Sequence, residues 1–157
     1  MRILFTKGRN PISFLIRKLT GEPVSHVAFC FDDAMVMHIN LAGFHIETIE
    51  KFEKKAKIVL EVERDITTFD EELVYQKLLP LRHVKYDYGA FLYWGLRTFL
   101  RRSFRVPMPN KNKWAAKSKL WCIELAEGLR PQLVIAPDVK LDAITPYQFY
   151  KILKGIE

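Results

Sequence analysis

The chain has 157 residues, an apolar fraction of 49% and a formal net charge of +7. Length and composition fit one globular domain over residues 1–157, large enough for a substantial core. No apolar run approaches the ~20 residues that span a bilayer, which excludes an evident transmembrane helix. The excess of Lys and Arg points to an anionic partner such as nucleic acid, a phospholipid surface or an acidic polymer, although solubility alone explains it equally well.

Residue spacing predicts strands early in the chain and helices after them. The predicted strands cover residues 2–6, 26–31, 35–41, 44–49 and 58–62, with 133–136 as a further candidate. The predicted helices cover residues 12–19, 68–81, 90–100, 121–129 and 146–153, and Asn10 and Thr145, each followed by a proline, are the predicted starts of the first and the last. Residues 50–57 are charged and expected to be exposed, and residues 101–119 form a basic loop. Strands gathered before residue 63 and helices after it predict an α+β fold.

The stretch from residue 25 to residue 40 predicts a hairpin that carries two histidines. Side chains alternate between the two faces of a strand, so His26 and His38 each fall on the less bulky face of their strand. An odd-length loop centred on Asp32 would place His26 directly opposite His38. A two-residue loop would send the rings to opposite faces, and the burial pattern favours the odd loop.

A candidate nucleophile lies late in the chain. Cys122 falls in the first predicted turn of a helix that follows the basic loop, where unpaired N–H groups and the cations of Lys117 and Lys119 would stabilise a thiolate. His26 is the best candidate base, and His38 would orient it. The backbone N–H of Cys122 would supply part of an oxyanion hole.

Other interpretations of these residues are open. A cysteine between Trp121 and Ile123 is also typical of an inert, buried thiol. Cys30 shares the histidine face but lies roughly 13 Å along the strand from His26, so we interpret it as packing. His45 and His83 are expected at the surface or in loops. The chain shows no third ligand at a zinc spacing, and we expect no metal or cofactor.

The order of these motifs resembles a known family. Pro11–Arg17, Ser25–Ala28, Val36–His38, Tyr86–Asp87, Trp121–Leu125 and Thr145–Pro146 are similar to segments of the circularly permuted branch of the NlpC/P60 cysteine hydrolases. That branch includes the YiiX/YebB-like proteins and the lecithin:retinol acyltransferase-like enzymes. In it a strand histidine comes first, a polar residue on the next strand second and a cysteine at a helix start last, which His26, His38 and Cys122 match. The residue after the cysteine, usually small or polar, is Ile123 here.

The resemblance implies a papain-like fold and thiol chemistry on an amide or ester. The expected activity is hydrolysis of a peptidoglycan peptide or isopeptide amide through a thioester, with a lipid acyl ester as the alternative substrate. Lys117, Lys119, Trp121 and Tyr86 are the expected substrate- or anion-binding residues.

Two further expectations concern location and a rival function. The amino terminus lacks the apolar core of a secretion signal, so a cytoplasmic protein is expected, with a phage origin as one route to a cell-wall role. The rival function is a non-catalytic module that binds nucleic acid or an anionic membrane through residues 97–119.

Overall fold

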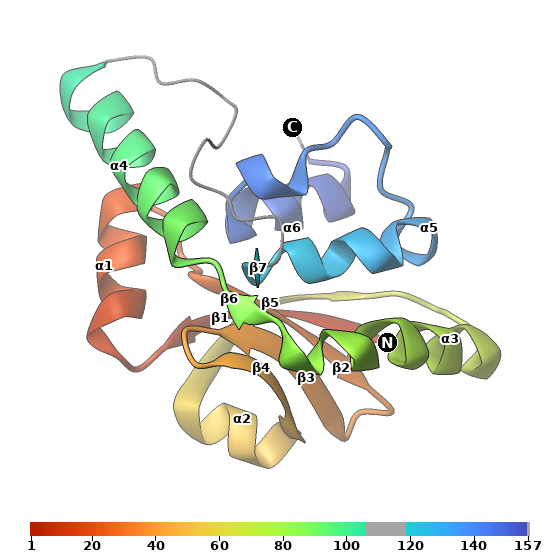
Figure 1. Cartoon of the computed structure of the whole chain (residues 1–157). Helices are drawn as coiled ribbons and strands as arrows, with labels where there is room; N and C mark the ends of the chain where they lie inside the picture. The colour runs from red at the N-terminus through yellow and green to blue at the C-terminus, as the bar shows by residue number, and fades with distance from the viewer. Residues whose placement is uncertain (106–118, 157) are drawn as a thin grey trace.

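The computed structural model describes residues 1–105 and 119–156, apart from the side chains of residues 68, 69, 90, 91 and 102. A five-stranded antiparallel sheet in the order β4-β3-β2-β1-β5 forms its centre (Figure 1). Its strands are β1 (Arg2–Gly8), β2 (His26–Phe31), β3 (Met35–Asn40), β4 (Gly43–Thr48) and β5 (Ala56–Glu63). A parallel pair, β6 (Lys85–Tyr86) and β7 (Lys119–Leu120), lies beside it.

Six α-helices and three 3₁₀ helices are described. They are α1 (Pro11–Thr20), α2 (Ile49–Lys55), α3 (Thr68–Leu78), α4 (Tyr88–Phe104), α5 (Arg130–Leu133), α6 (Pro146–Lys154), η1 (Leu79–His83), η2 (Glu124–Leu129) and η3 (Leu141–Ala143). The predicted α+β class is confirmed. In the described part of the chain no helix combines the length and the apolar character needed to cross a bilayer.

The caps predicted for two helices are present. Asn10 accepts a hydrogen bond from the Ser13 backbone N–H at 2.7 Å and begins α1. Thr145 and Gln148 form a reciprocal capping box at the start of α6. In both helices a proline follows the cap, where its missing N–H costs nothing.

Both faces of the sheet are covered. The larger core packs Phe5, Phe29 and Met37 against the helices that follow the sheet in sequence. On the other face α2 lays Phe52 over Leu4, Ala28, Cys30 and Val36 (Figure 1). The helix α2 therefore covers part of the sheet face that carries His26 and His38.

The predicted odd hairpin loop is present, but its centre is Asp33. Phe31 pairs with Met35, which leaves a three-residue loop in which Asp32 and Asp33 have φ values of 49° and 52°. Aspartate tolerates this left-handed region better than most residues. The register sets His38 opposite Ala28, two residues from His26, so the predicted direct His26–His38 pairing is wrong, while both rings stay on one face.

Three local predictions are wrong. Residues 133–136 are not a strand: α5 ends at Leu133, and Val134 caps it in a left-handed conformation. The helix predicted over 121–129 is a 3₁₀ helix from Glu124, with Cys122 in the turn before it. The basic loop begins later than predicted, since α4 extends to Phe104. The charged segment 50–57 is largely exposed as expected, and most of it forms α2, in which Phe52 is buried.

Candidate functional site

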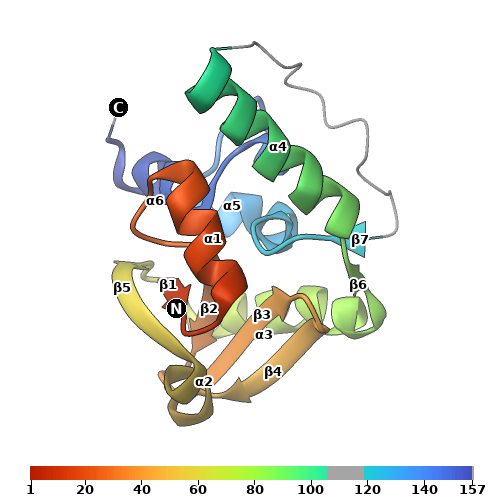
Figure 2. The same ribbon diagram turned by 90° about the vertical axis from the view of Figure 1, so that its left-hand side faces the viewer.

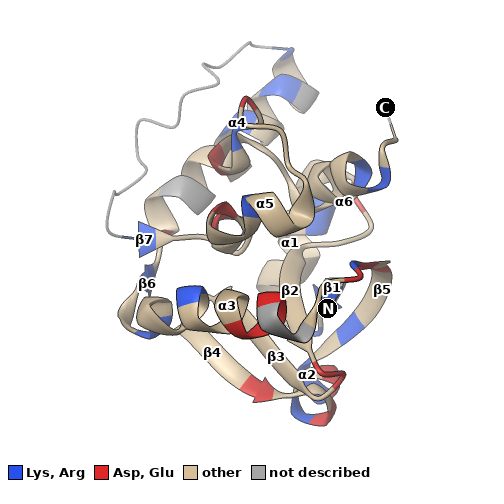
Figure 3. Cartoon of the chain, turned by 90° about the vertical axis from the view of Figure 1, so that its right-hand side faces the viewer, with Lys and Arg blue, Asp and Glu red and all other residues tan. Residues whose placement is uncertain are grey.

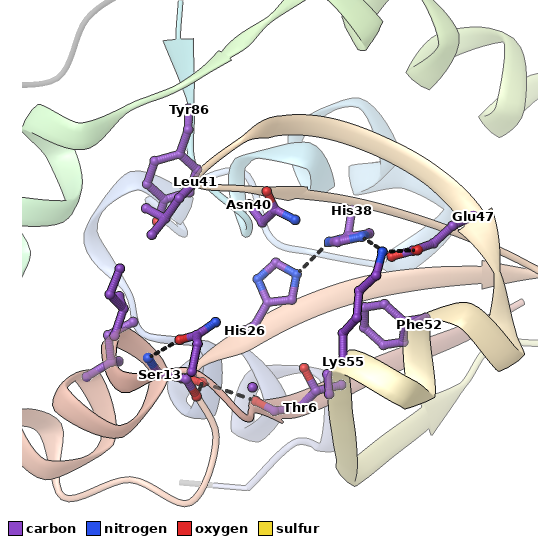
Figure 4. A pocket seen from close by; sticks show the side chains of 16 residues that line it. Thr6, Ser13, His26, His38, Asn40, Leu41, Glu47, Phe52, Lys55 and Tyr86 are labelled. Carbon is purple, nitrogen blue, oxygen red and sulfur yellow. Dashed lines mark hydrogen bonds and ion pairs between the residues drawn. The ribbon is translucent and has the colours of Figure 1, made fainter.

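The two predicted histidines meet on the sheet. His26 begins β2 and His38 lies within the neighbouring strand β3. The Nε2 atom of His26 lies 3.1 Å from Nδ1 of His38, and the rings are edge-to-face with centroids 5.2 Å apart (Figure 4). This distance is that of a hydrogen bond, so the orienting contact expected for His38 is present.

The chain of contacts continues to residues that the sequence analysis missed. His38 Nε2 lies 3.1 Å from Oε1 of Glu47, and the second Glu47 oxygen pairs with Lys55 Nζ at 2.5 Å (Figure 4). We call His26, His38 and Glu47 the relay. Side-chain alternation along β4 could have placed Glu47 on the same face as the histidines. Lys55 was missed because it lies in the charged segment that was expected to be exposed surface.

The relay fixes the tautomers of both rings. Glu47 pairs with a lysine, so its carboxylate accepts, and His38 must donate from Nε2. Burial, then His45 and Lys55, lower the pKa of His38 to about 3, so its ring is neutral and Nδ1 accepts. His26 then donates from Nε2, which leaves its Nδ1 without a proton. That nitrogen is the available base.

His45 is half-buried within β4, whereas the sequence analysis expected it at the surface or in a loop. It pairs with His38 across β3 and β4, and the two rings stack with centroids 5.4 Å apart. Its Nε2 is buried and has no hydrogen-bond partner among the described residues. Burial and then His38 lower the pKa of His26 well below its usual value. His83 is exposed on η1 as expected.

Cys122 lies at the other half of the candidate site. Its side chain packs in the larger core and is only 3% exposed. Burial raises the pKa of the thiol to about 12, although backbone hydrogen bonding at Val27 and at Cys122 itself acts in the opposite direction. The predicted stabilised thiolate is therefore wrong for this conformation, because desolvation outweighs the local N–H groups.

Two neighbouring cavities contain the two halves of the site. The histidine cavity, of about 130 Å³, is lined by His26 and His38, and the thiol cavity, of about 340 Å³, is lined by Cys122. Ile16, Ser25 and Tyr86 line both and form a shared wall. In the described part of the chain the imidazoles bond to one another and to Glu47, and neither bonds to the thiol. The histidine cavity and the thiol cavity are therefore neighbours, but no hydrogen bond joins either imidazole to the thiol of Cys122.

The thiol cavity is mainly apolar. Leucines and a phenylalanine from α1 and α4 line it, together with Trp94 and Trp121, whose rings stack with centroids 6.2 Å apart. Burial and then the neighbouring Cys122 raise the pKa of Tyr86 well above its usual value. Trp121 and Tyr86 thus line the same cavity as the thiol of Cys122.

The predicted cationic contacts are only partly described. Lys119 of β7 is half-buried and pairs with Lys85 of β6, and Figure 3 draws both short strands partly in blue. Lys117 lies outside the described residues, as does most of the basic loop. Cys30 is buried under α2 with Arg2 3.8 Å from its sulfur, which agrees with its interpretation as a packing residue. Within residues 1–105 and 119–156 no three His, Cys, Asp or Glu side chains are grouped to hold a metal ion.

No family model matches the chain, and no curated protein or solved structure matches it either.

Proposed function

We propose that the chain is a thiol-dependent acyl hydrolase or acyltransferase, in which Cys122 attacks an ester carbonyl and the relay moves the proton. The observation that carries this proposal is the oriented His26–His38–Glu47 chain beside a cavity that contains a cysteine. The chain order of His26, His38 and Cys122 resembles that of the permuted NlpC/P60 hydrolases, which have a papain-like fold, and this resemblance supports the proposal.

The relay would act as a base and an electrostatic support. His26 Nδ1 would take the proton from the Cys122 thiol as sulfur bonds to the carbonyl carbon, and return it to the leaving alcohol as the tetrahedral intermediate collapses. His38 would stabilise the charged His26 ring, with Glu47 holding His38 in the required tautomer. Water or a second acceptor would then cleave the thioester and release the thiol.

The high pKa of Cys122 determines when the proton moves. A thiol whose pKa is about 12 is protonated at neutral pH, so proton transfer and attack must be coupled. The backbone N–H groups near the sulfur would also stabilise negative charge on the carbonyl oxygen. Substrate binding must open the wall formed by Ile16, Ser25 and Tyr86, because it separates the two cavities.

The lining of the thiol cavity favours an acyl ester over a peptidoglycan amide. Leu, Ile, Phe and Trp make up half of the residues that line it, and these side chains suit a hydrocarbon chain. A peptide amide would bring polar groups that need partners, and burying such a group unpaired costs about 1–3 kcal/mol. The amide substrate remains the competing substrate class to be measured.

The test compares p-nitrophenyl esters of increasing acyl length with peptide amides. Wild type should cleave long-chain esters best, and denaturing mass spectrometry should find the acyl group on Cys122. Cys122→Ala should fall to background, and His26→Ala should lose about 10²–10⁴-fold in kcat. The matched control, Cys30→Ala, removes the other buried thiol and should keep activity. Ester cleavage that survives Cys122→Ala, or acylation of no cysteine, would reject the proposal.

A further inference from the structure

Two helices expose apolar side chains at the mouth of the thiol cavity. Four of its lining residues are also at least 40% exposed to solvent: Leu15, Leu92, Leu96 and Phe99. We call these four residues the apolar lip. Leu15 comes from α1 and the other three form one stripe of α4, at the i, i+4 and i+7 spacing. The apolar faces of both helices therefore remain partly uncovered.

The two helices form one continuous surface. They contact one another in the fold and lie side by side at one end of the molecule (Figures 1 and 2). Phe14 and Ile12 of α1 are also exposed apolar residues, although they line other cavities. Apolar side chains exposed singly are ordinary, but an area that spans two helices and surrounds a cavity indicates an interaction site.

The charges around the lip are positive. Lys18 in α1, and Arg101 and Arg105 at the end of α4, are exposed, and neither helix contains an acidic residue. No Asp or Glu occurs anywhere from Tyr88 to Ile123. Glu22 shares a cavity with Arg101, and its carboxyl accepts a hydrogen bond from Thr145, so it offsets only part of this charge.

We propose that the apolar lip docks on an anionic lipid bilayer, with Lys18, Arg101 and Arg105 at the headgroups. Helices that lie in a membrane interface combine Leu and Phe on one side with Lys and Arg on the other. A second copy of the chain would bring the same cations together, which disfavours self-association through this face. Docking also places the mouth of the thiol cavity at the bilayer, where acyl chains are found.

This inference does not depend on the proposed reaction. Docking uses side chains outside the relay and requires no catalysis, so Cys122→Ala should bind vesicles as wild type does. If the ester assay fails and vesicle binding succeeds, the surface stands without the enzyme. If vesicle binding fails while esters are cleaved, the enzyme stands without the surface.

The experiment is flotation of the whole chain with vesicles of phosphatidylcholine alone or with about one third phosphatidylglycerol. Wild type should float with the anionic vesicles and weaken as salt rises, since headgroup attraction is screened. Leu92→Gln, Leu96→Gln and Phe99→Gln combined should reduce binding about tenfold or more. A matched triple, Met35→Gln, Tyr75→Gln and Val134→Gln, removes exposed apolar side chains from other elements and should bind normally.

A second pair of variants tests the charges. Lys18→Gln with Arg101→Gln should weaken binding about fivefold per cation. Lys51→Gln with Lys54→Gln removes the same charge from exposed positions on α2, away from α1 and α4, and should change binding less than about twofold (Figure 1).

Three results would overturn the proposal. The first is equal flotation with neutral and anionic vesicles, and the second is a lip triple that binds like wild type. The third is a dimer of wild type that the lip triple dissociates, without any binding to vesicles.

Discussion

Buried ionisable side chains control the chemistry of the site at the scale of single residues. His38 is 4% exposed and neutral, with a pKa of about 3, because burial, His45 and Lys55 all oppose its protonation. The neutral ring is what allows it to accept from His26 and donate to Glu47 at once. A protonated ring would donate from both nitrogens and reverse the polarity of the His26 contact.

The lowered pKa of His38 predicts how stability changes with pH. The unfolded chain protonates near 6.5 and the folded one near 3, so between these values the unfolded state binds more protons. This contribution is complete above about pH 6.5 and is lost as pH falls toward 3. Urea unfolding should show that wild type loses about 3 kcal/mol more than His38→Asn between pH 7.5 and 4. Parallel curves for the two proteins would contradict the buried neutral ring.

The raised pKa of Glu124 predicts the opposite change of stability with pH. Burial raises its pKa to about 7, against the hydrogen bond that it accepts from the Trp121 N–H at 2.9 Å beside Cys122. The folded state holds a proton that the unfolded state releases above about pH 4.5, so stability falls as pH rises from there to about 7. Glu124→Gln keeps an acceptor oxygen and removes this cost. Since the side chain is only half-buried and solvent screens part of this cost, we expect a gain of about 2 kcal/mol at pH 8 and little at pH 4, measured by urea unfolding.

At the scale of secondary-structure elements, a single buried contact can determine whether a charged segment packs against the sheet. The charged run that became α2 has one buried anchor, Phe52, which packs against Leu4 and Ala28 on the sheet. That contact also brings Lys55 to Glu47 at the end of the relay. A segment that reads as solvated surface from composition alone is therefore part of the site.

The helix α5 ends at Val134, whose backbone is strained. It caps α5 with φ 55°, a left-handed conformation that costs a β-branched residue about 1–2 kcal/mol, and it is 86% exposed. Val134→Gly should relieve this strain with no loss of packing and stabilise the protein by about 0.5–1 kcal/mol. Thermal unfolding would measure the gain. Val134→Ala keeps the Cβ and should recover less of it, and a lower melting temperature for the glycine variant would contradict the assignment.

At the scale of the whole molecule, the packing of distant segments controls access to the thiol. Cys122 lies in the core beneath the apolar cavity that α1 and α4 enclose, and Cys30 lies under α2. Both thiols are buried, and burial raises the pKa of each. In the protein without substrate, the thiol of Cys122 is therefore protonated and shielded from solvent.

This burial predicts slow alkylation of the native protein. With a pKa of about 12 instead of 9, Cys122 holds about 1,000-fold less thiolate at pH 7 than in the unfolded chain. Iodoacetamide labelling followed by peptide mass spectrometry should find both cysteines slow in buffer and fast in urea. Rapid labelling of native Cys122 below neutral pH would show instead that the thiol is activated before substrate binds.

The sequence by itself determined the features that depend on local periodicity. Alternation assigned the strands and set His26 and His38 on one face, and the caps at Asn10 and Thr145 marked two helices. These signals are local because neighbouring side chains on a strand or in a helix turn have fixed relative directions. The same periodicity left the loop centre wrong by one residue, since hairpin turns of similar length differ little in pattern.

Only the tertiary structure decided the rest of the site. It added Glu47, Lys55 and His45 to the two histidines, and it gave Cys122 a high pKa in place of the expected activation. Desolvation depends on every segment that packs around a group, whereas a helix terminus or a nearby lysine can be read from adjacent residues. The cover over the thiol comes from α1 and α4, which are far from Cys122 in sequence and meet it only after the chain has folded.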